Sequence, residues 1–283
     1  MSKLISPLDP DDPRGSAALE QALAEVLVPI APDAADASRM RARLLDRARA
    51  SRAADERFIN VRREEGGWRP LVKGVRVKLL CEGADSRSVL VELQAGAALP
   101  THRHHEHEEC VVLRGEAQLG ELQVRRGDYH LALAGSRHGR VSSRSGALLY
   151  LRGTSIGSGI EVARDLITAW LPGAGADPIT VRAGEGEWRD FAPGVQSKSL
   201  WQDEGAHSML LRLQPGARIA GHPHPVPEEC LMLEGEAFFG DTLLRTGEFQ
   251  FAPAGTAQRE VTSDVGALLF VHGAAGDGAR ARA

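Results

Sequence analysis

Cysteine is scarce in this sequence of 283 residues, which has only Cys81, Cys110 and Cys230. Their number is odd and no two of them form a CxxC pair, so the sequence argues against a disulfide framework and favours a reducing compartment. Long apolar runs are missing too. The N-terminal residues contain no apolar core of a signal peptide, and no run of about eighteen apolar residues occurs, so we expect no membrane span and a cytoplasmic location.

A marked excess of either charge is also missing. The formal net charge is -4 and the sequence pI is about 6.2. These values argue against a surface that coats nucleic acid, and we expect no direct nucleic-acid partner. Hydrophobic residues make up 42% and charged residues 25% of the chain, as in an ordinary globular protein. At this length we expect more than one domain.

Residues 1–55 are predicted to be a leader followed by helices. Residues 1–15 are rich in proline and aspartate, and apolar residues then recur at helical spacing from 17 to about 30, which predicts a first helix. A second helix is predicted for about 39–54, with Ser38 as its N-cap. The arginines of this second segment indicate a solvated face, with an acidic partner or nucleic acid as the alternative. They are Arg39, Arg41, Arg43, Arg47, Arg49 and Arg52.

Beyond residue 55 the sequence consists of short alternating apolar runs separated by glycine turns. The clearest runs are residues 75–80, 89–93, 110–113 and 147–151. Many short strands with glycine turns are typical of an antiparallel sandwich or barrel. We therefore predict an all-β fold for this part of the chain.

The same design occurs twice. An offset of 120 residues superposes Trp68 on Trp188 and Gly96 on Gly216 without a gap, and it also superposes the Gly-Ala-Leu-Leu run at 146–149 on that at 266–269. Two copies of one unit predict two tandem domains, residues 56–154 and 176–274, packed as a pseudo-dimer. Residues 155–175 are then a linker with a short helix, and residues 275–283 a disordered tail.

Histidine is concentrated in one short stretch of the first repeat, since four of the ten histidines lie between positions 102 and 107. His102 and His104 are two residues apart, so both point to the same face of an extended strand, and Glu108 keeps that parity. Two imidazoles and a carboxylate suit a divalent cation such as Zn, Fe, Mn, Ni or Cu better than Ca or Mg. Downstream, a strand bounded by glycines leads to His138, which offers a further ligand.

These spacings resemble the cupin signature, G(X)5HXH(X)3-4E(X)6G followed by G(X)5PXG(X)2H. The first half fits at each fixed position from Gly96 to Gly115, whereas Leu133 takes the place of the proline in the second half. The resemblance implies a jelly-roll β-barrel with a four-residue metal site. Its ligands would be His102, His104, Glu108 and His138.

The second repeat fits the first half of the signature again and also keeps the proline, as Pro253. By the same resemblance its metal-site residues would be His222, His224, Glu228 and Gln258. Gln258 stands where the first repeat has His138, and an amide oxygen is a poorer donor to such a metal than an imidazole nitrogen. We therefore expect weaker binding in the second repeat, whose site could be catalytic, weakly occupied or a remnant.

Some neighbours of the ligands have the opposite parity. His105, His107 and Glu109 are expected to face away from the metal, as polar residues around the ligands or on the surface. Two repeat-equivalent pairs of residues are expected to be buried or to pack in the core or between the domains. They are Cys110 and Cys230, and Trp68 and Trp188.

The chain is also similar to the cupin module of ChrR-type anti-sigma factors, through its HRHHEHEEC and LRGEAQLGE runs and the preceding helix ending in MRARLLDRARA. This resemblance implies a metal-binding sensory or regulatory protein of a transcriptional stress response. Zinc is the expected metal, with iron, manganese or nickel as alternatives. The expected partner is a sigma factor or another regulatory protein, and a homodimer is a further expected assembly. That family grips its sigma factor with a His-and-two-Cys zinc motif, and no such cluster precedes residue 81 here.

An enzymatic interpretation competes with the regulatory one. Similar small cupins include dioxygenases that cleave diketones or hydroxyketones at a non-haem metal, so a small-molecule ligand is the alternative partner. A four-ligand tetrahedral zinc site would be closed, whereas octahedral iron with the same ligands would keep two positions open. The residues alone leave the choice between enzyme and regulator open.

Overall fold

A computed structural model describes residues 21, 32–83, 87–104, 106–154 and 177–274, and the chain divides into two compact units, residues 1–53 and 54–283. The predicted first helix, linker helix and C-terminal tail lie outside the described residues, except for the helical residue 21. In the described part of the chain, no helix is both long and apolar enough to cross a membrane.

Helix α2 (Ala34–Asp55) begins earlier than predicted. Its N-cap is Asp33, whose Oδ1 accepts the backbone N–H of Asp36 at 2.8 Å. The prediction of Ser38 as N-cap is wrong, because Ser38 lies inside the helix and its hydroxyl donates to the carbonyl oxygen of Ala34 at 2.7 Å. Asp33 is an equally good cap, and the alanines after it favour helix, so the helix starts there. The six arginines of α2 are exposed.

Each repeat forms a set of antiparallel strands. Those of the first repeat are β1 (Ile59–Val61), β2 (Arg69–Val72), β3 (Val75–Glu82), β4 (Arg87–Leu93), β5 (Ala98–Leu99), β6 (His102–Arg103), β7 (Glu108–Leu119), β8 (Leu122–Arg125), β9 (Tyr129–Ala132), β10 (Arg137–His138), β11 (Val141–Ser142) and β12 (Ala147–Arg152). Those of the second repeat are β13 (Ile179–Val181), β14 (Arg189–Ala192), β15 (Val195–Gln202), β16 (Ala206–Leu213), β17 (Ala217–Ile219), β18 (His222–His224), β19 (Glu228–Phe239), β20 (Thr242–Arg245), β21 (Phe249–Ala252), β22 (Thr256–Gln258), β23 (Val261–Ser263) and β24 (Ala267–Ala274).

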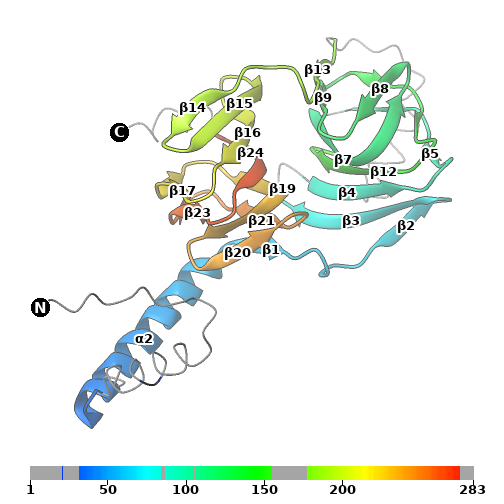
Figure 1. Cartoon of the computed structure of the whole chain (residues 1–283). Coiled ribbons are helices and arrows are strands. Elements are labelled where there is room, and N and C mark those ends of the chain that lie inside the picture. Colours follow the sequence, from blue (N-terminus) through cyan, green and yellow to red (C-terminus); the bar gives the residue numbers. More distant parts are fainter. Residues whose placement is uncertain (1–20, 22–31, 84–86, 105, 155–176, 275–283) are drawn as a thin grey trace, which may run out of the picture. The chain divides into compact units, whose positions relative to one another are not determined.

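The strands build two barrels of matching topology (Figure 1). In the first, called barrel 1, the strand order is β13-β9-β7-β12-β4-β3-β2, and in the second, barrel 2, it is β1-β21-β19-β24-β16-β15-β14. Two-stranded ladders, β10-β6 and β18-β22, occupy the same place in each repeat. The predicted all-β architecture of two tandem barrels is confirmed.

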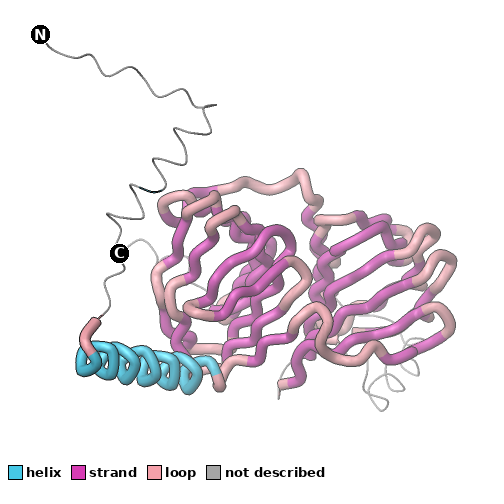
Figure 2. Tube along the Cα trace, turned by 60° about the horizontal axis from the view of Figure 1, so that its bottom comes forward, coloured by secondary structure: helices cyan, strands magenta, loops and turns pink. Residues whose placement is uncertain are grey.

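The first strand of each repeat belongs to the sheet of the other barrel. β1 pairs with β21 of the second repeat, and β13 pairs with β9 of the first. Side chains reinforce both pairings, since Gln250 Nε2 donates to Asn60 Oδ1 at 2.8 Å and His130 Nδ1 lies 2.9 Å from the Thr180 hydroxyl oxygen. The two barrels therefore exchange their first strands while their sheets stay separate, and Figure 2 shows the two barrels side by side.

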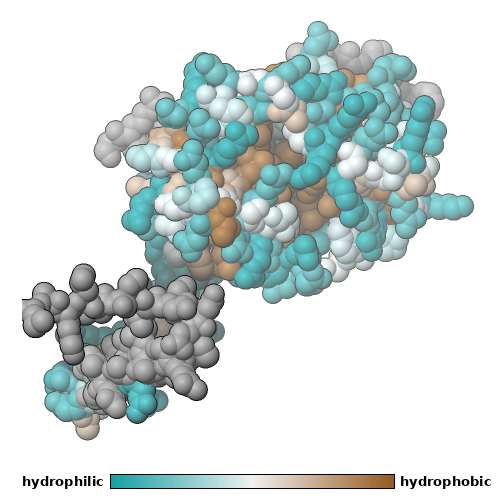
Figure 3. Space-filling model, in the orientation of Figure 1, coloured by the Kyte–Doolittle hydropathy of each residue, from teal (hydrophilic) through white to brown (hydrophobic). Residues whose placement is uncertain are grey.

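Three apolar clusters stabilise the barrel unit. One fills each barrel, and the third joins residues of both repeats between the barrels. In this third cluster the rings of Tyr150 and Phe270, which are repeat-equivalent, lie 5.4 Å apart and both are fully buried. Burial of one such side chain stabilises the fold by about 1.5–3 kcal/mol. The visible outer face of the barrels is mostly hydrophilic, with apolar side chains showing in its hollows (Figure 3).

The predicted packing residues are found at these clusters. Cys110 and Cys230 are buried in the cores of barrels 1 and 2. Trp68 and Trp188 pack against the cluster between the barrels. Each indole also carries an arginine on its face, and for Trp188 the guanidinium carbon of Arg212 lies 3.9 Å from the ring centroid.

Candidate metal centres

Three side chains of the first repeat gather at the start of β7. One potential ligand atom from each of His102, His104 and Glu108 lies within 4.8 Å of the other two. His104 and Glu108 are buried, and His102 is half-buried. The Nδ1 of His104 lies 3.8 Å from Glu108 Oε1. The shared parity of these positions therefore brings two imidazoles and a carboxylate together.

The second repeat builds the same group. Here Glu228 Oε1 lies 3.4 Å from His224 Nε2, and Glu228 Oε2 lies 3.7 Å from His222 Nε2. Two ligands that are each about 2.1 Å from one cation lie roughly 3 to 3.4 Å apart. The observed separations are thus close to those of a metal site.

The tautomer of His224 is determined by its surroundings. The hydroxyl of Thr256 donates to the carbonyl oxygen of Pro253 at 2.6 Å, so its oxygen can only accept from His224 Nδ1, which lies 3.0 Å away. Nδ1 therefore carries the proton and Nε2 the lone pair. This Nε2 is buried and has no hydrogen-bond partner among the described residues. A bound cation would satisfy it.

The first histidine of each group is oriented by a backbone carbonyl. His102 Nδ1 lies 3.0 Å from the carbonyl oxygen of Pro100, and His222 Nδ1 lies 3.3 Å from that of Ala220. A carbonyl oxygen can only accept, so Nδ1 donates and Nε2 keeps its lone pair. Such a hydrogen bond is the usual support of a metal-binding histidine.

The carboxylate of the second group is ionised. Burial alone would raise the pKa of Glu228, but when the His222 and His224 imidazoles are protonated, their Nε2–H groups and positive charge outweigh burial and lower this pKa to about 2. Metal ligands must be deprotonated. Glu228 is therefore ready to bind a cation at neutral pH without releasing a proton.

The fourth position is equivalent in the two repeats. The backbone register places His138 opposite His102 and Gln258 opposite His222. Gln258 is buried and lines the same cavity as His222 and Glu228. In each repeat the fourth residue of the expected set thus lies on the strand paired with the one that carries the first histidine.

A family model described as the ChrR cupin-like domain matches residues 56–155 and again residues 176–275. The chain belongs to this family. No curated protein matches it.

Solved structures with the same fold are bicupins of low sequence identity. One is a candidate dioxygenase from Nostoc punctiforme, with 18% identity, a TM-score of 0.55, and coverage of 75% of this chain and 78% of that chain. Another is oxalate decarboxylase from Bacillus subtilis at pH 4.6, with 18% identity, a TM-score of 0.55, and coverage of 76% of this chain and 75% of that chain. At this identity the likeness shows the fold. Together with the two His/His/Glu groups, the family match makes the protein a metal-binding bicupin.

Cupin barrel 2 contains an apolar cavity of about 70 Å³ beside its metal group. His222, Glu228 and Gln258 line one part of it, and apolar side chains such as Phe191 and Met209 line the rest. No lysine or arginine is among the described residues that line this cavity. A water molecule needs about 10–15 Å³ by this measure, so the space holds several waters or one small uncharged molecule next to the ligands.

Among the residues of opposite parity, Glu109 has a role that parity alone does not reveal. His105 lies outside the described residues, and His107 Nδ1 accepts the backbone N–H of Ala134 at 3.1 Å. Glu109 is only 1% exposed and reaches side chains of barrel 2. The sequence contains one sign of this role, because Glu229 follows the ligand Glu228 in the second repeat as Glu109 follows Glu108 in the first.

Proposed function

We propose that this bicupin is a metal-dependent sensory or regulatory protein of the ChrR type, acting in a transcriptional stress response in the cytoplasm. The observation that carries the proposal is the match of the ChrR cupin-like family to both repeats, each with its His/His/Glu group. In this role the metal centres change the protein's affinity for a partner and do not turn over a substrate.

Zinc is the metal we propose for barrel 1. His102, His104 and Glu108 would hold it, with His138 as the fourth ligand from the paired strand. Bound zinc would supply a closed, redox-inert centre that ties the β10-β6 ladder to the start of β7. The hydrogen bond from His102 Nδ1 to Pro100 prepares that site in advance.

The proposed partner is a sigma factor or another regulatory protein. Support for a protein partner comes from α2, whose arginines are exposed and could meet an acidic surface. Met40 and Leu44 of the same helix are also exposed, at 55% and 64%. Exposed apolar and basic side chains together are typical of a helix that binds another protein. A homodimer is the other assembly we propose to test.

The test is direct binding of the purified full chain to the purified sigma factors of its source organism. Zinc-loaded and chelator-treated protein are compared by titration calorimetry, with the Met40→Ser/Leu44→Ser variant as a control for the helix surface. We expect one sigma factor to bind, with an affinity that changes at least tenfold on metal removal and falls in the variant. Absence of binding in both metal states would contradict the proposal.

A second function is favoured by the cavity of barrel 2. A non-haem metal-dependent dioxygenase needs coordination positions for oxygen and substrate, and His222, His224 and Glu228 leave such positions open. The cavity beside them is apolar and has no lysine or arginine in its described lining. It therefore suits a small neutral diketone or hydroxyketone better than a dianion such as oxalate, on which a protein of similar fold acts.

Oxygen uptake by the iron-loaded protein with small diketones tests this alternative. Uptake that is lost in His222→Ala and kept in His104→Ala would show catalysis in barrel 2. Val261→Phe, which fills the cavity, should then abolish uptake without removing the metal. No uptake above that of free iron would leave the regulatory function as the better account of both barrels.

A further inference from the structure

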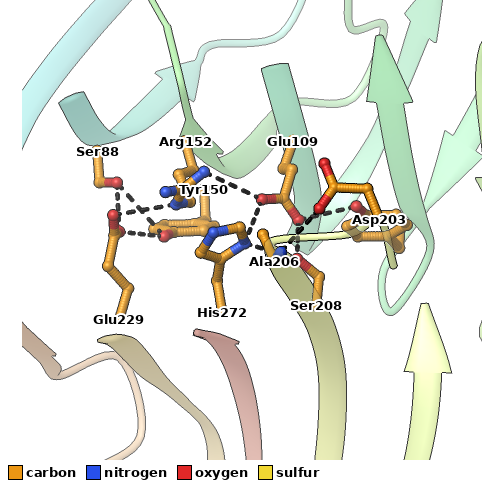
Figure 4. A network of polar contacts seen from close by, with 10 residues as sticks. Ser88, Glu109, Tyr150, Arg152, Asp203, Ala206, Ser208, Glu229 and His272 are labelled. Carbon is orange, nitrogen blue, oxygen red and sulfur yellow. Dashed lines mark hydrogen bonds and ion pairs between the residues drawn. The ribbon is translucent and has the colours of Figure 1, made fainter. Parts of the chain in front are cut away.

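A buried polar network connects the two barrels directly behind their metal groups. Its centre is a pair of repeat-equivalent carboxylates, Glu109 on β7 and Glu229 on β19, which are 1% and 3% exposed. Each directly follows a ligand glutamate in the chain, Glu108 or Glu228. Figure 4 shows Arg152 and His272 lying between the two carboxylates.

Glu109 follows the metal ligand Glu108 in the chain, but its carboxylate contacts side chains of barrel 2. Its Oε1 lies 2.8 Å from Nδ1 of His272, and its Oε2 accepts a hydrogen bond from the Ser208 hydroxyl. The Tyr129 hydroxyl of barrel 1 donates to the same carboxylate at 2.8 Å. The carboxylate is thus fixed by both barrels at once.

Glu229 makes the reciprocal connection from barrel 2 to barrel 1. Its carboxylate accepts hydrogen bonds from the Tyr150 hydroxyl at 2.7 Å and from the Ser88 hydroxyl. Arg152 Nε donates to it at 3.1 Å, while the Nη1 of the same guanidinium lies 3.4 Å from Glu109. One planar guanidinium therefore bridges both carboxylates through two different nitrogens, a fixed geometry that the single nitrogen of an ammonium group does not reproduce.

Two glycines connect the network with the ligand glutamates of the metal groups. Gly153, which follows Arg152, packs so closely on the first metal group that a Cβ there would overlap the carbonyl oxygen of His107 and lie 3.7 Å from the Glu108 Cα. Gly273, which follows His272, packs on the second, where a Cβ would lie 3.0 Å from Glu228 Oε2. Each bridging residue is thus covalently next to a backbone segment that touches a ligand glutamate.

We propose that this network couples the two metal centres, so that metal in barrel 1 raises the affinity of barrel 2, with Arg152 and His272 as positioning residues. The inference rests on the proposed metal binding of both barrels. Metal on Glu108 restricts the backbone that carries Glu109, and through His272 and Gly273 it restricts Glu228. A ligand that is already ordered loses less conformational freedom when it binds.

The coupling should be about tenfold in the dissociation constant of barrel 2, within the usual range for linked sites. It is measured by zinc titration against a competing chelator. In the wild type the weaker phase reports barrel 2 with barrel 1 filled. In the His102→Ala/His104→Ala variant barrel 1 is disabled, so the same phase reports barrel 2 with barrel 1 empty. We expect the second value to be about tenfold weaker.

Variants of the network distinguish coupling from a general effect of the ligand substitutions. Arg152→Lys keeps the charge but replaces the two separate donor nitrogens by one, and Glu109→Gln keeps the side-chain shape. In either background, the zinc dissociation constants of barrel 2 measured with barrel 1 filled and with barrel 1 empty should differ less than twofold. The matched control is Arg126→Gln, which removes an exposed ion pair to Glu234 of the other repeat, 2.6 Å long, and should keep the full difference.

Two results would overturn the coupling. One is an affinity of barrel 2 that is the same whether barrel 1 is filled or empty. The other is a tenfold difference that survives in both network variants, since the connection would then run elsewhere. Failure of the metal-binding proposal is distinguishable from these, because it would appear as a wild type that binds no zinc in either phase.

Discussion

His224 and Thr256 form a hydrogen bond that prepares a metal ligand, with Nδ1 of the imidazole 3.0 Å from the hydroxyl oxygen. The threonine hydroxyl is itself committed to the carbonyl oxygen of Pro253. The imidazole is therefore held in the one tautomer that leaves the lone pair on Nε2, where it can bind the same cation as Glu228. The same chain of contacts fixes the ring orientation.

Thr256→Val removes this support while keeping the shape of the side chain. We expect the metal affinity of barrel 2 to fall about 10- to 100-fold, as for other residues that orient metal ligands. Thr246→Val is the matched control, because its hydroxyl donates to the Gly235 carbonyl oxygen on the exposed surface of the same barrel. Chelator competition measures both, and equal losses in the two variants would argue against the orienting role.

Gln258→His should strengthen barrel 2. The substitution restores the residue type that His138 supplies in barrel 1, at the register position opposite His222. An imidazole is a better ligand for zinc than an amide, so we expect a gain of about tenfold or more in zinc affinity. Gln202→His, at the exposed end of β15, controls for an added histidine. An unchanged affinity would mean that residue 258 does not reach the metal.

Gly153→Ala should disrupt barrel 1 more than its φ angle alone would suggest. Gly153 and Gly96 have similar positive φ angles of 75° and 78°, which cost a non-glycine residue about 1–2 kcal/mol. At Gly96 a Cβ would meet nothing within 4 Å, whereas at Gly153 it would overlap the His107 carbonyl. Urea unfolding should therefore show a loss of about 3 kcal/mol or more for Gly153→Ala. A loss no larger than that of Gly96→Ala would contradict the close packing.

His130 should make the metal-free protein less stable in acid. Burial lowers the pKa of His130 to about 4 from the ordinary 6.5. Between these pH values the unfolded chain binds a proton that the folded protein does not, so stability is complete above pH 6.5 and falls as the pH is lowered towards 4. The second repeat has Gln250 at this position. In His130→Gln, the acid-induced loss of unfolding free energy should shrink by up to about 3 kcal/mol, as measured by urea unfolding at several pH values; an unchanged slope would contradict this.

The barrels could be predicted from the sequence because the patterns that specify their strands are local and occur in both repeats. Alternating runs such as residues 75–80 and 147–151 became β3 and β12, and the gapless offset of 120 residues revealed the second barrel. Strand parity also brought together His102, His104 and Glu108. The strands and the ligand groups depend on residues a few positions apart, for which periodicity is informative, and the second barrel follows from the repeat.

The connections between the barrels could not be predicted in this way. β1 and β13 are three residues long and pair with strands of the other repeat, a choice decided by tertiary packing and not by local pattern. Strand parity predicted the direction of the Glu109 side chain, but it did not predict the contacts of this side chain with Ser208 and His272. Ser38 failed as an N-cap because Asp33, an equally good cap, stands before it.

The metal content of the purified, zinc-reconstituted chain tests the central claim most directly, namely that each barrel of this bicupin holds its own metal. We expect two equivalents in the wild type by mass spectrometry of the bound element. His104→Ala and His224→Ala should each remove one equivalent, and the double variant both. A wild type without bound metal, or single variants that both retain two equivalents, would contradict the assignment of the two centres.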